Sequence, residues 1–209
     1  MRPQLLSLMA RVAHDGRVIA EARRLAERWL KDRRAVAPDM VGAVLSIAAA
    51  SNDTRLFDHL LAEARRVKDR RERAILLGSL GAFVAPALRD RALALVAGNE
   101  FDQREAINIV NRDLFNRETR AATWTWLQPH LDALLAKMRE DDAMRFIGRV
   151  PRAFCDDGHR AEAEAFLGSR AKTHPGAPHE LDQGLEAVRT CALSWARNKP
   201  AIDAFLAKY

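Results

Sequence analysis

The sequence lacks the features of a membrane-inserted or disulfide-rich secreted chain. No apolar run in its 209 residues approaches the roughly 20 residues needed to cross a bilayer. The apolar stretch within residues 1–12 is too short for a signal peptide and has the pattern of an amphipathic helix. The two cysteines, Cys155 and Cys191, are far apart and show no framework spacing. We therefore expect reduced thiols, a cytoplasmic location and no membrane partner.

Complete catalytic motifs are also missing: the sequence has no glycine-rich phosphate loop and no serine in a nucleophile elbow. The nearest candidate begins with His179 and Glu180. A zinc-peptidase helix needs a second histidine four residues after the first, because these two side chains share one helix face. That position is Gln183, and Ile202 stands where a third ligand is expected. Pro178 indicates an ordinary helix start, so we predict no metal site here.

A second possible metal pair is formed by Cys155 and His159, with Asp156 and Asp157 between them. No other Cys/His pair at zinc spacing accompanies it. A buried Cys155 beside a polar turn at residues 156–158 is the favoured interpretation. The sequence therefore predicts no catalytic residue, no metal ligand and no cofactor held by this chain.

Alternating, β-branched segments are absent, so we expect almost no sheet. Residues 70–99 show the expected helical unit. One helix runs to about Ala82, a second begins at Pro86, and Gly98 ends it. Two helices of similar length joined by a few residues are predicted to fold back on each other as an antiparallel hairpin.

The rest of the chain repeats this pattern. About a dozen helices are expected, with Asn52 or Asp53 and Asp102 as capping residues, and with Pro129 and Pro200 each starting a further helix. The sequence therefore predicts one all-α domain over residues 1–209. Its architecture is an α-α superhelix, a solenoid of degenerate HEAT-like antiparallel hairpins with a concave working face.

The charge is moderately basic, because 34 Lys and Arg residues outnumber 28 Asp and Glu residues to give a net charge of +6. The two signs are interleaved along most helices, which is typical of a solvated face and disfavours a nucleic-acid partner. The basic segment 65–73 and the pair Trp124 and Trp126 nevertheless keep an alternative open. This alternative is a HEAT-like nucleic-acid-binding protein of the DNA glycosylase type. A protein–protein scaffold is the third possibility.

The order of several motifs resembles one known domain. Residues 71–96 contain the pattern Glu-Arg-x-x-x-Leu-Gly-x-Leu-x-x-Phe, and further matching segments follow. Together these segments resemble the C-terminal helical domain of M1-family zinc aminopeptidases, as found in endoplasmic-reticulum aminopeptidases and in many bacterial aminopeptidase N-like enzymes. The resemblance extends from near Leu5 to Phe205. The other matching segments are Gln103, 116–118, 126–127, 130–134, 146–150, 154–155, 163–167 and 185–195.

This resemblance implies a bowl of helical hairpins that covers a catalytic domain of the same polypeptide and bounds a peptide chamber. It also implies that the zinc and its ligands belong to that catalytic domain, so that the present chain is non-catalytic. Relatives often carry a basic residue two positions before the glutamine that matches Gln103, whereas Phe101 occupies that position here. We expect peptide C-termini to be attracted instead by arginines of the concave face, with Arg104, Arg112, Arg117 and Arg145 as candidates.

Overall fold

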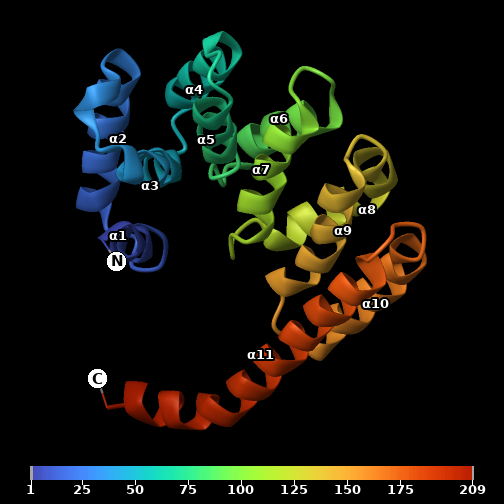
Figure 1. Cartoon of the computed structure of the whole chain (residues 1–209). Coiled ribbons are helices and arrows are strands. Elements are labelled where there is room, and N and C mark those ends of the chain that lie inside the picture. The colour runs from blue at the N-terminus through green and yellow to red at the C-terminus, as the bar shows by residue number, and fades with distance from the viewer. Residues whose placement is uncertain (1, 209) are drawn as a thin grey trace. The chain divides into compact units, whose positions relative to one another are not determined.

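The computed structural model describes residues 2–208, and every regular element within that range is a helix (Figure 1). Met1 and Tyr209 lie outside the described residues. The chain divides into two compact units, Met1–Leu134 and Leu135–Tyr209. The all-α prediction is confirmed, and each unit is described by itself below.

The first unit is built from consecutive helices joined by short connections. Asp15, Asp53, Asp69 and Asp102 each accept backbone N–H groups at the start of a helix, which satisfies donors that a helix leaves unpaired there. The predicted caps Asp53 and Asp102 are thereby confirmed. The elements are α1 (Arg2–Arg11), α2 (Gly16–Lys31), η1 (Arg33–Ala35), α3 (Pro38–Ala48), η2 (Ala49–Ser51), α4 (Thr54–Arg66), α5 (Arg70–Leu80), α6 (Pro86–Ala97), α7 (Gln103–Leu114) and α8 (Arg120–Leu135).

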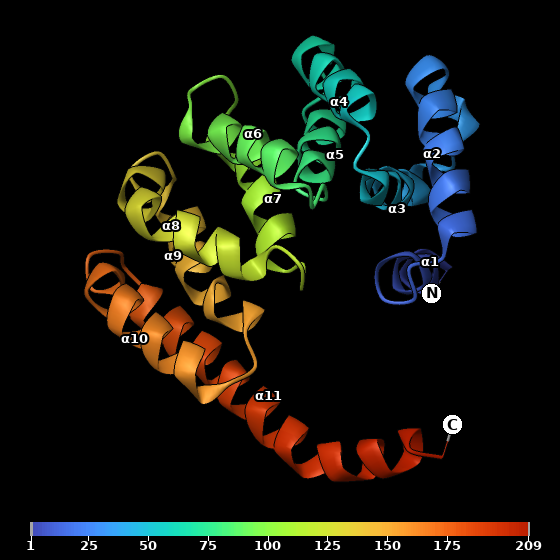
Figure 2. The ribbon, with the colours of Figure 1, turned by 180° about the vertical axis from the view of Figure 1, so that it is seen from behind.

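The helices α2/α3, α4/α5 and α6/α7 pack as pairs, and α3 packs on α5 as α5 packs on α7 (Figures 1 and 2). α3, α5 and α7 begin at Pro38, Arg70 and Gln103, so each repeat occupies 32 or 33 residues. Contacts between repeats recur at this separation. The side chain of Asn52, in the left-handed conformation at φ 51°, accepts the N–H groups of Val84 and Ala85, both at 2.9 Å.

The prediction that the two helices of residues 70–99 fold back on each other as a hairpin is wrong. α5 ends at Leu80 and packs mainly on α4 and α7, while α6 packs on α7. Gly81 explains the contact of the α5 end with α7. A Cβ atom at this position would lie 2.3 Å from the carbonyl oxygen of Ile109, so only glycine allows the approach.

The second unit consists of α9 (Glu140–Arg149), η3 (Pro151–Ala153), α10 (Asp157–Ala171) and α11 (Ala177–Leu206), with α9 and α10 packed on α11. Leu181, Leu185 and Val188 of α11 are buried. The same seven-residue spacing places Trp195 and Ile202 along the continued stripe, and these are 53% and 40% exposed. The outer half of α11 therefore carries an uncovered apolar face within the described part of the chain.

Three predicted boundaries are wrong. α8 continues through Pro129 because buried side chains at helical spacing lie on both sides of it, including Leu127 and Leu131, and their burial offsets the lost hydrogen bond. α11 likewise continues through Pro200, whose fixed φ is compatible with a helix. The turn expected at residues 156–158 is a helix start, because Asp156 accepts the N–H of His159 at 2.9 Å and caps α10.

The prediction of two reduced thiols is also wrong. Cys155, just before α10, and Cys191, on α11, form a disulfide with their Cα atoms 5.2 Å apart. The separation of 36 residues along the sequence did not indicate a disulfide, because the two cysteines come together only when α10 packs on α11. The cytoplasmic location that we inferred from reduced thiols loses this support and stays a prediction.

The crossing of α9 and α11 yields the first testable prediction. A Cβ atom on Gly148 would lie 2.5 Å from the carbonyl oxygen of Glu180, so Gly148→Ala must push the two helix backbones apart. We expect a loss of about 1–3 kcal/mol in the free energy of unfolding, measured by urea denaturation. Gly168→Ala on α10 is the matched control, because nothing lies within 4 Å of its added Cβ. This control is expected to stabilise by about 0.5–1 kcal/mol, and equal effects of the two variants would refute the close crossing.

The disulfide yields a second prediction. It closes a loop across α10 and the start of α11, so breaking it increases the entropy of the unfolded chain. The double variant Cys155→Ser, Cys191→Ser is expected to lose roughly 2–4 kcal/mol of unfolding free energy. A reducing agent should lower the thermal midpoint of the original chain and leave that of the double variant unchanged. Free thiols titrated in the non-reduced, folded protein would contradict the pairing.

Candidate functional site

The four arginines predicted to bind peptide do not form one cluster. Arg104 lies in the first turn of α7, Arg112 lies in its last turn and Arg117 follows in the turn before α8, so these three belong to the first unit. Arg145 lies on α9 in the second unit. All four are exposed. Arg104 Nη2 donates to Asp102 Oδ2 at 2.9 Å, and Arg145 Nη1 lies 3.8 Å from Asp141 Oδ2.

A pocket of about 470 Å³ lies between the end of α1 and the turn that follows α7. Figures 1 and 2 show these two segments on the same side of the first unit. Arg117 is therefore placed at a cavity, and the charge of Arg112 lies close enough to act on Arg11 within it. Sequence reasoning missed Arg11, whose only signal was a cation in the last turn of an amphipathic helix. The pocket is lined by Arg11, Val12, His14, Phe115, Asn116, Arg117 and Glu118.

Arg11 has the most unusual environment among the pocket residues. Its Nη2 atom is buried and donates to no acceptor among the described residues. Burial lowers the pKa of Arg11, the positive charge of Arg112 lowers it further, and the negative charge of Glu118 opposes both effects. The pocket therefore contains a desolvated cation whose charge the protein compensates only in part.

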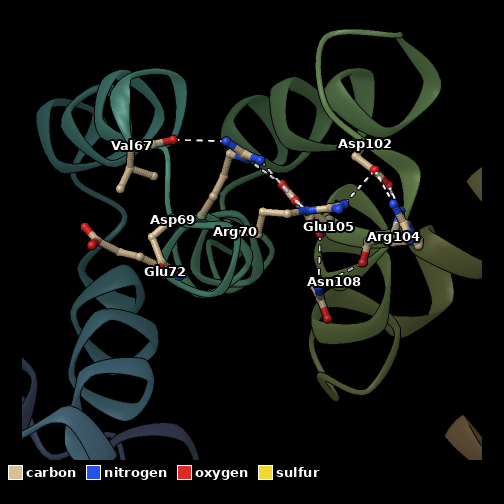
Figure 3. A network of polar contacts seen from close by, with 9 residues as sticks. Val67, Asp69, Arg70, Glu72, Asp102, Arg104, Glu105 and Asn108 are labelled. Atoms are coloured by element: carbon tan, nitrogen blue, oxygen red, sulfur yellow. Dashed lines mark hydrogen bonds and ion pairs between the residues drawn. The ribbon is translucent and has the colours of Figure 1, made fainter.

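A network of ion pairs joins α5 to α7 (Figure 3). Glu105 is buried, and its carboxylate accepts hydrogen bonds from Arg73 and, at 2.7 Å, from Arg70. Arg70 Nη2 also donates to Asp102 Oδ2 at 2.7 Å, and Arg104 shares that carboxylate. Arg104 is thus held by a structural network rather than directed to a cavity.

The basic segment 65–73, which motivated the nucleic-acid alternative, is largely used in such pairs. Arg65 donates to Glu100 at 2.5 Å and Arg66 to Glu63 at 2.8 Å, while Arg70 and Arg73 bind Glu105. Neutralised guanidinium groups contribute little to phosphate binding, because that binding depends on net positive charge along a stripe.

A second pocket of about 420 Å³ lies between α2 and α4. Its lining mixes cations such as Arg23 and Lys31 with Glu27 and Glu63. Arg23 also forms an ion pair with Asp53, and Glu63 pairs with Arg33 and Arg66, which do not line the groove. None of the buried polar atoms that lack a hydrogen-bond partner in residues 2–208 belongs to this groove, and its lining offers no defined chemistry for a ligand.

The two metal candidates have other contacts. His179 Nε2 lies 2.9 Å from Gln183 Nε2 in the first turns of α11. The His159 ring stacks on Phe154 with centroids 4.3 Å apart, and its Nδ1 bonds to Asp156 at 2.7 Å. No cluster of three or more His, Cys, Asp or Glu suited to a metal ion occurs among residues 2–208.

Asp113 is a buried polar centre between α7 and α8. It is fully buried, its Oδ2 accepts the hydroxyl of Thr123 at 2.6 Å, and its backbone carbonyl accepts the hydroxyl of Thr119 at 2.7 Å. Burial raises the pKa of Asp113. These contacts hold the turn containing Arg117 against the end of α7, so Asp113 positions one wall of the pocket.

Across the described residues, no helix has the length and apolar character needed to span a membrane.

Comparison with known proteins gives one family and several relatives. The family described as "ERAP1-like C-terminal domain" matches residues 1–190. Aminopeptidase M1-C of Oryza sativa subsp. japonica is 26% identical over 90% of this chain and 22% of its own length. Aminopeptidase M1 of Arabidopsis thaliana is 26% identical over 95% of this chain and 22% of its own length. Aminopeptidase 2 of Candida albicans is 22% identical over 88% of this chain. The chain thus spans about a fifth of the length of these relatives.

The ion pairs of the first unit predict how its stability depends on pH. Hydrogen bonds from Arg66 and Arg33 lower the pKa of Glu63 to about 2. The pKa values of Asp102 and Glu105 are lowered in the same way by Arg104 and Arg73. A lowered folded-state pKa stabilises the fold above the unfolded-state pKa, and this contribution is lost as pH falls through the folded-state value. We expect the free energy of unfolding to fall progressively from about pH 5 to pH 2.

The variant that checks this is Glu63→Gln, measured by urea denaturation at several pH values. It is expected to lose about 1–3 kcal/mol at pH 7 and to show a shallower decline on acidification. Glu27→Gln is the control, because Glu27 is 53% exposed and its pair with Arg23 spans 3.5 Å. A decline in Glu63→Gln as steep as in the original chain would show that this carboxylate does not stabilise the fold.

Proposed function

Since the chain belongs to the ERAP1-like C-terminal domain family, we propose that it is the non-catalytic C-terminal part of an M1-type zinc aminopeptidase. The observation that carries this proposal is the family match over residues 1–190, together with relatives named aminopeptidase that are several times longer. In such an enzyme the catalytic zinc belongs to the part outside this chain. Residues 1–209 then act as one accessory domain.

The proposed role is to cover the active site of the catalytic part and to bound the chamber that holds peptides. Two features support a partner of the same polypeptide. Leu5 and Leu8 on α1, and Trp195 on α11, are more than half exposed, and apolar surface of this kind is usually covered by another protein surface. Peptides are the proposed ligands, with Arg112 and Arg117 better placed to bind them than Arg104, which is held by Asp102.

The nucleic-acid alternative has less support, because the arginines that suggested it are paired with carboxylates. A scaffold role without a chamber remains the second alternative. A bacterial source, which the resemblance to bacterial aminopeptidase N-like enzymes suggests, stays a prediction, and so does the cytoplasmic location. The relatives reported above come from Oryza sativa, Arabidopsis thaliana and Candida albicans.

The deciding experiment uses the protein of native length from its source. We expect a mass several times that of this chain, a zinc-peptidase motif outside residues 1–209, and hydrolysis of aminoacyl amides that stops when zinc is chelated. The isolated 209-residue chain should show no such hydrolysis with zinc added.

A truncation tests the chamber itself. Removing residues 1–209 from the native protein is expected to change the ratio of kcat/KM for a nonapeptide to that for an aminoacyl amide by at least about tenfold. Retained hydrolysis of the amide shows that the catalytic part is still folded. An unchanged ratio, or zinc-dependent turnover by the isolated chain, would refute the accessory role.

A further inference from the structure

The disulfide of the second unit lies at its rim rather than in its core. Cys191 is exposed and Cys155 is half-buried, whereas Phe154 beside it is 4% exposed. Because a helix covers most of its own backbone, the exposed area of Cys191 on α11 belongs largely to its side chain. Disulfides that solvent reaches exchange readily with thiols, since the attacking thiolate needs access to a sulfur atom. This bond is therefore open to attack while the unit is folded.

The bond joins two stretches that the packing leaves uncovered. Among the residues that the structure describes, none from 157 to 162, at the start of α10, is buried, and none from 189 to 208, on α11, is buried. The first buried side chain of α10 is Ala163, and the last of α11 is Val188. Figure 1 shows α11 extending past α9 and α10. The disulfide is thus a covalent link between stretches that buried apolar contacts do not hold.

Polar contacts near the bond act mainly within one helix. Asp156 caps α10 and also binds the ring of His159. The charge of Arg160 on α10 acts on Glu186 of α11, but Glu186 is 57% exposed and pairs with Arg189 of its own helix. Water screens exposed ion pairs, so such an interaction contributes little to holding one helix on another.

We propose that Cys155 and Cys191 form a redox site that external thiols open and external disulfides close in the folded protein. A thiolate of a dithiol reductant attacks the sulfur of Cys191, the bond between the two cysteines breaks, and Cys155 leaves as a thiolate that takes up a proton. The second thiol of the reductant then displaces Cys191 from the mixed disulfide. The reductant ends as a disulfide and both cysteines end as thiols, a two-electron reduction that a disulfide oxidant reverses.

Opening the bond loosens the start of α10, residues 157–162, and the middle of α11, residues 189–195. The close crossing of α9 and α11 at Gly148 is unaffected, because it depends on helix backbones in contact. The middle of α11 includes Trp195, where the exposed apolar face of this helix begins. The redox state therefore controls how well ordered the base of this face is. The exchange itself is independent of the proposed function, whereas the importance of the face for a partner rests on it.

The first test follows reduction of the 209-residue chain by dithiothreitol under native conditions, with free thiols alkylated and counted by mass spectrometry. We expect a reduction rate proportional to the dithiothreitol concentration, because the reductant attacks the folded protein. A brief reaction with glutathione should leave the mixed disulfide on Cys191. A rate that becomes independent of the dithiothreitol concentration would mean that unfolding must come first, and would overturn the proposal. A mixed disulfide found mainly on Cys155 would refute the assigned point of attack.

Hydrogen exchange of the oxidised and reduced chain locates the consequence. Amides of the start of α10 and of the middle of α11 are expected to exchange at least about tenfold faster after reduction. Amides of residues 181–188 and of α9 should stay nearly unchanged, and oxidised glutathione should restore the original pattern. Both cysteines belong to the second unit, so the first unit is an internal reference. A loss of protection spread over the whole second unit, or no loss at all, would contradict the proposal.

Variants separate the bond from other effects of the reductant. The double variant Cys155→Ser, Cys191→Ser is expected to show the exchange pattern of the reduced chain both with and without dithiothreitol. Ala161→Ser is the matched control, because it adds a hydroxyl at an exposed position of α10 and keeps the disulfide. This control should respond to dithiothreitol as the original chain does. A double variant that keeps the protection of the oxidised chain would show that the bond does not control local order.

Discussion

The stacking of helical hairpins in the first unit depends on carboxylates that accept hydrogen bonds from arginine side chains of the preceding repeat. Glu105 on α7 is the clearest case, because it is buried and binds both Arg70 and Arg73 of α5 (Figure 3). Removing one partner of such a pair leaves an uncompensated buried charge, so the network strongly disfavours any other register of α5 on α7. Asn52 adds a neutral contact at the same spacing by binding the N–H groups of residues 84–85.

This arrangement explains why the basic segment 65–73 offers little uncompensated positive charge to an external anion. A formal charge of +6 suggests an open positive surface, but most guanidinium groups of α4 and α5 are committed to acidic partners of the same unit. Arg11 differs, because one of its nitrogens is buried without an acceptor and its neighbour Arg112 carries the same charge. The buried nitrogen, rather than the absence of an ion pair, distinguishes Arg11 from the exposed arginines of the chain.

The second unit is stabilised by different means. α9 and α11 approach so closely that Gly148 and Gly184 admit no side chain, and a disulfide joins the start of α10 to α11. Beyond Cys191, α11 continues with an exposed apolar stripe that contains Trp195 and Ile202. The family match ends at residue 190, so this exposed half of α11 lies outside it. Such a surface is expected where a domain meets a partner, which agrees with a role as part of a larger enzyme.

Local chemistry in the sequence determined the helices and the family. The helices could be predicted from the helical spacing of apolar residues and from the aspartates that precede helices, because both signals depend on residues close together in the sequence. The family could be predicted from the order of several weak motifs along the chain. Packing decided the rest. α5 packs on α4 and α7 rather than on α6, α8 continues through Pro129, and Cys155 pairs with Cys191, because burial and contacts between distant residues outweigh local preferences. Arg11 became a candidate only in three dimensions, since an unpaired buried nitrogen is a property of its surroundings and leaves no trace in the sequence.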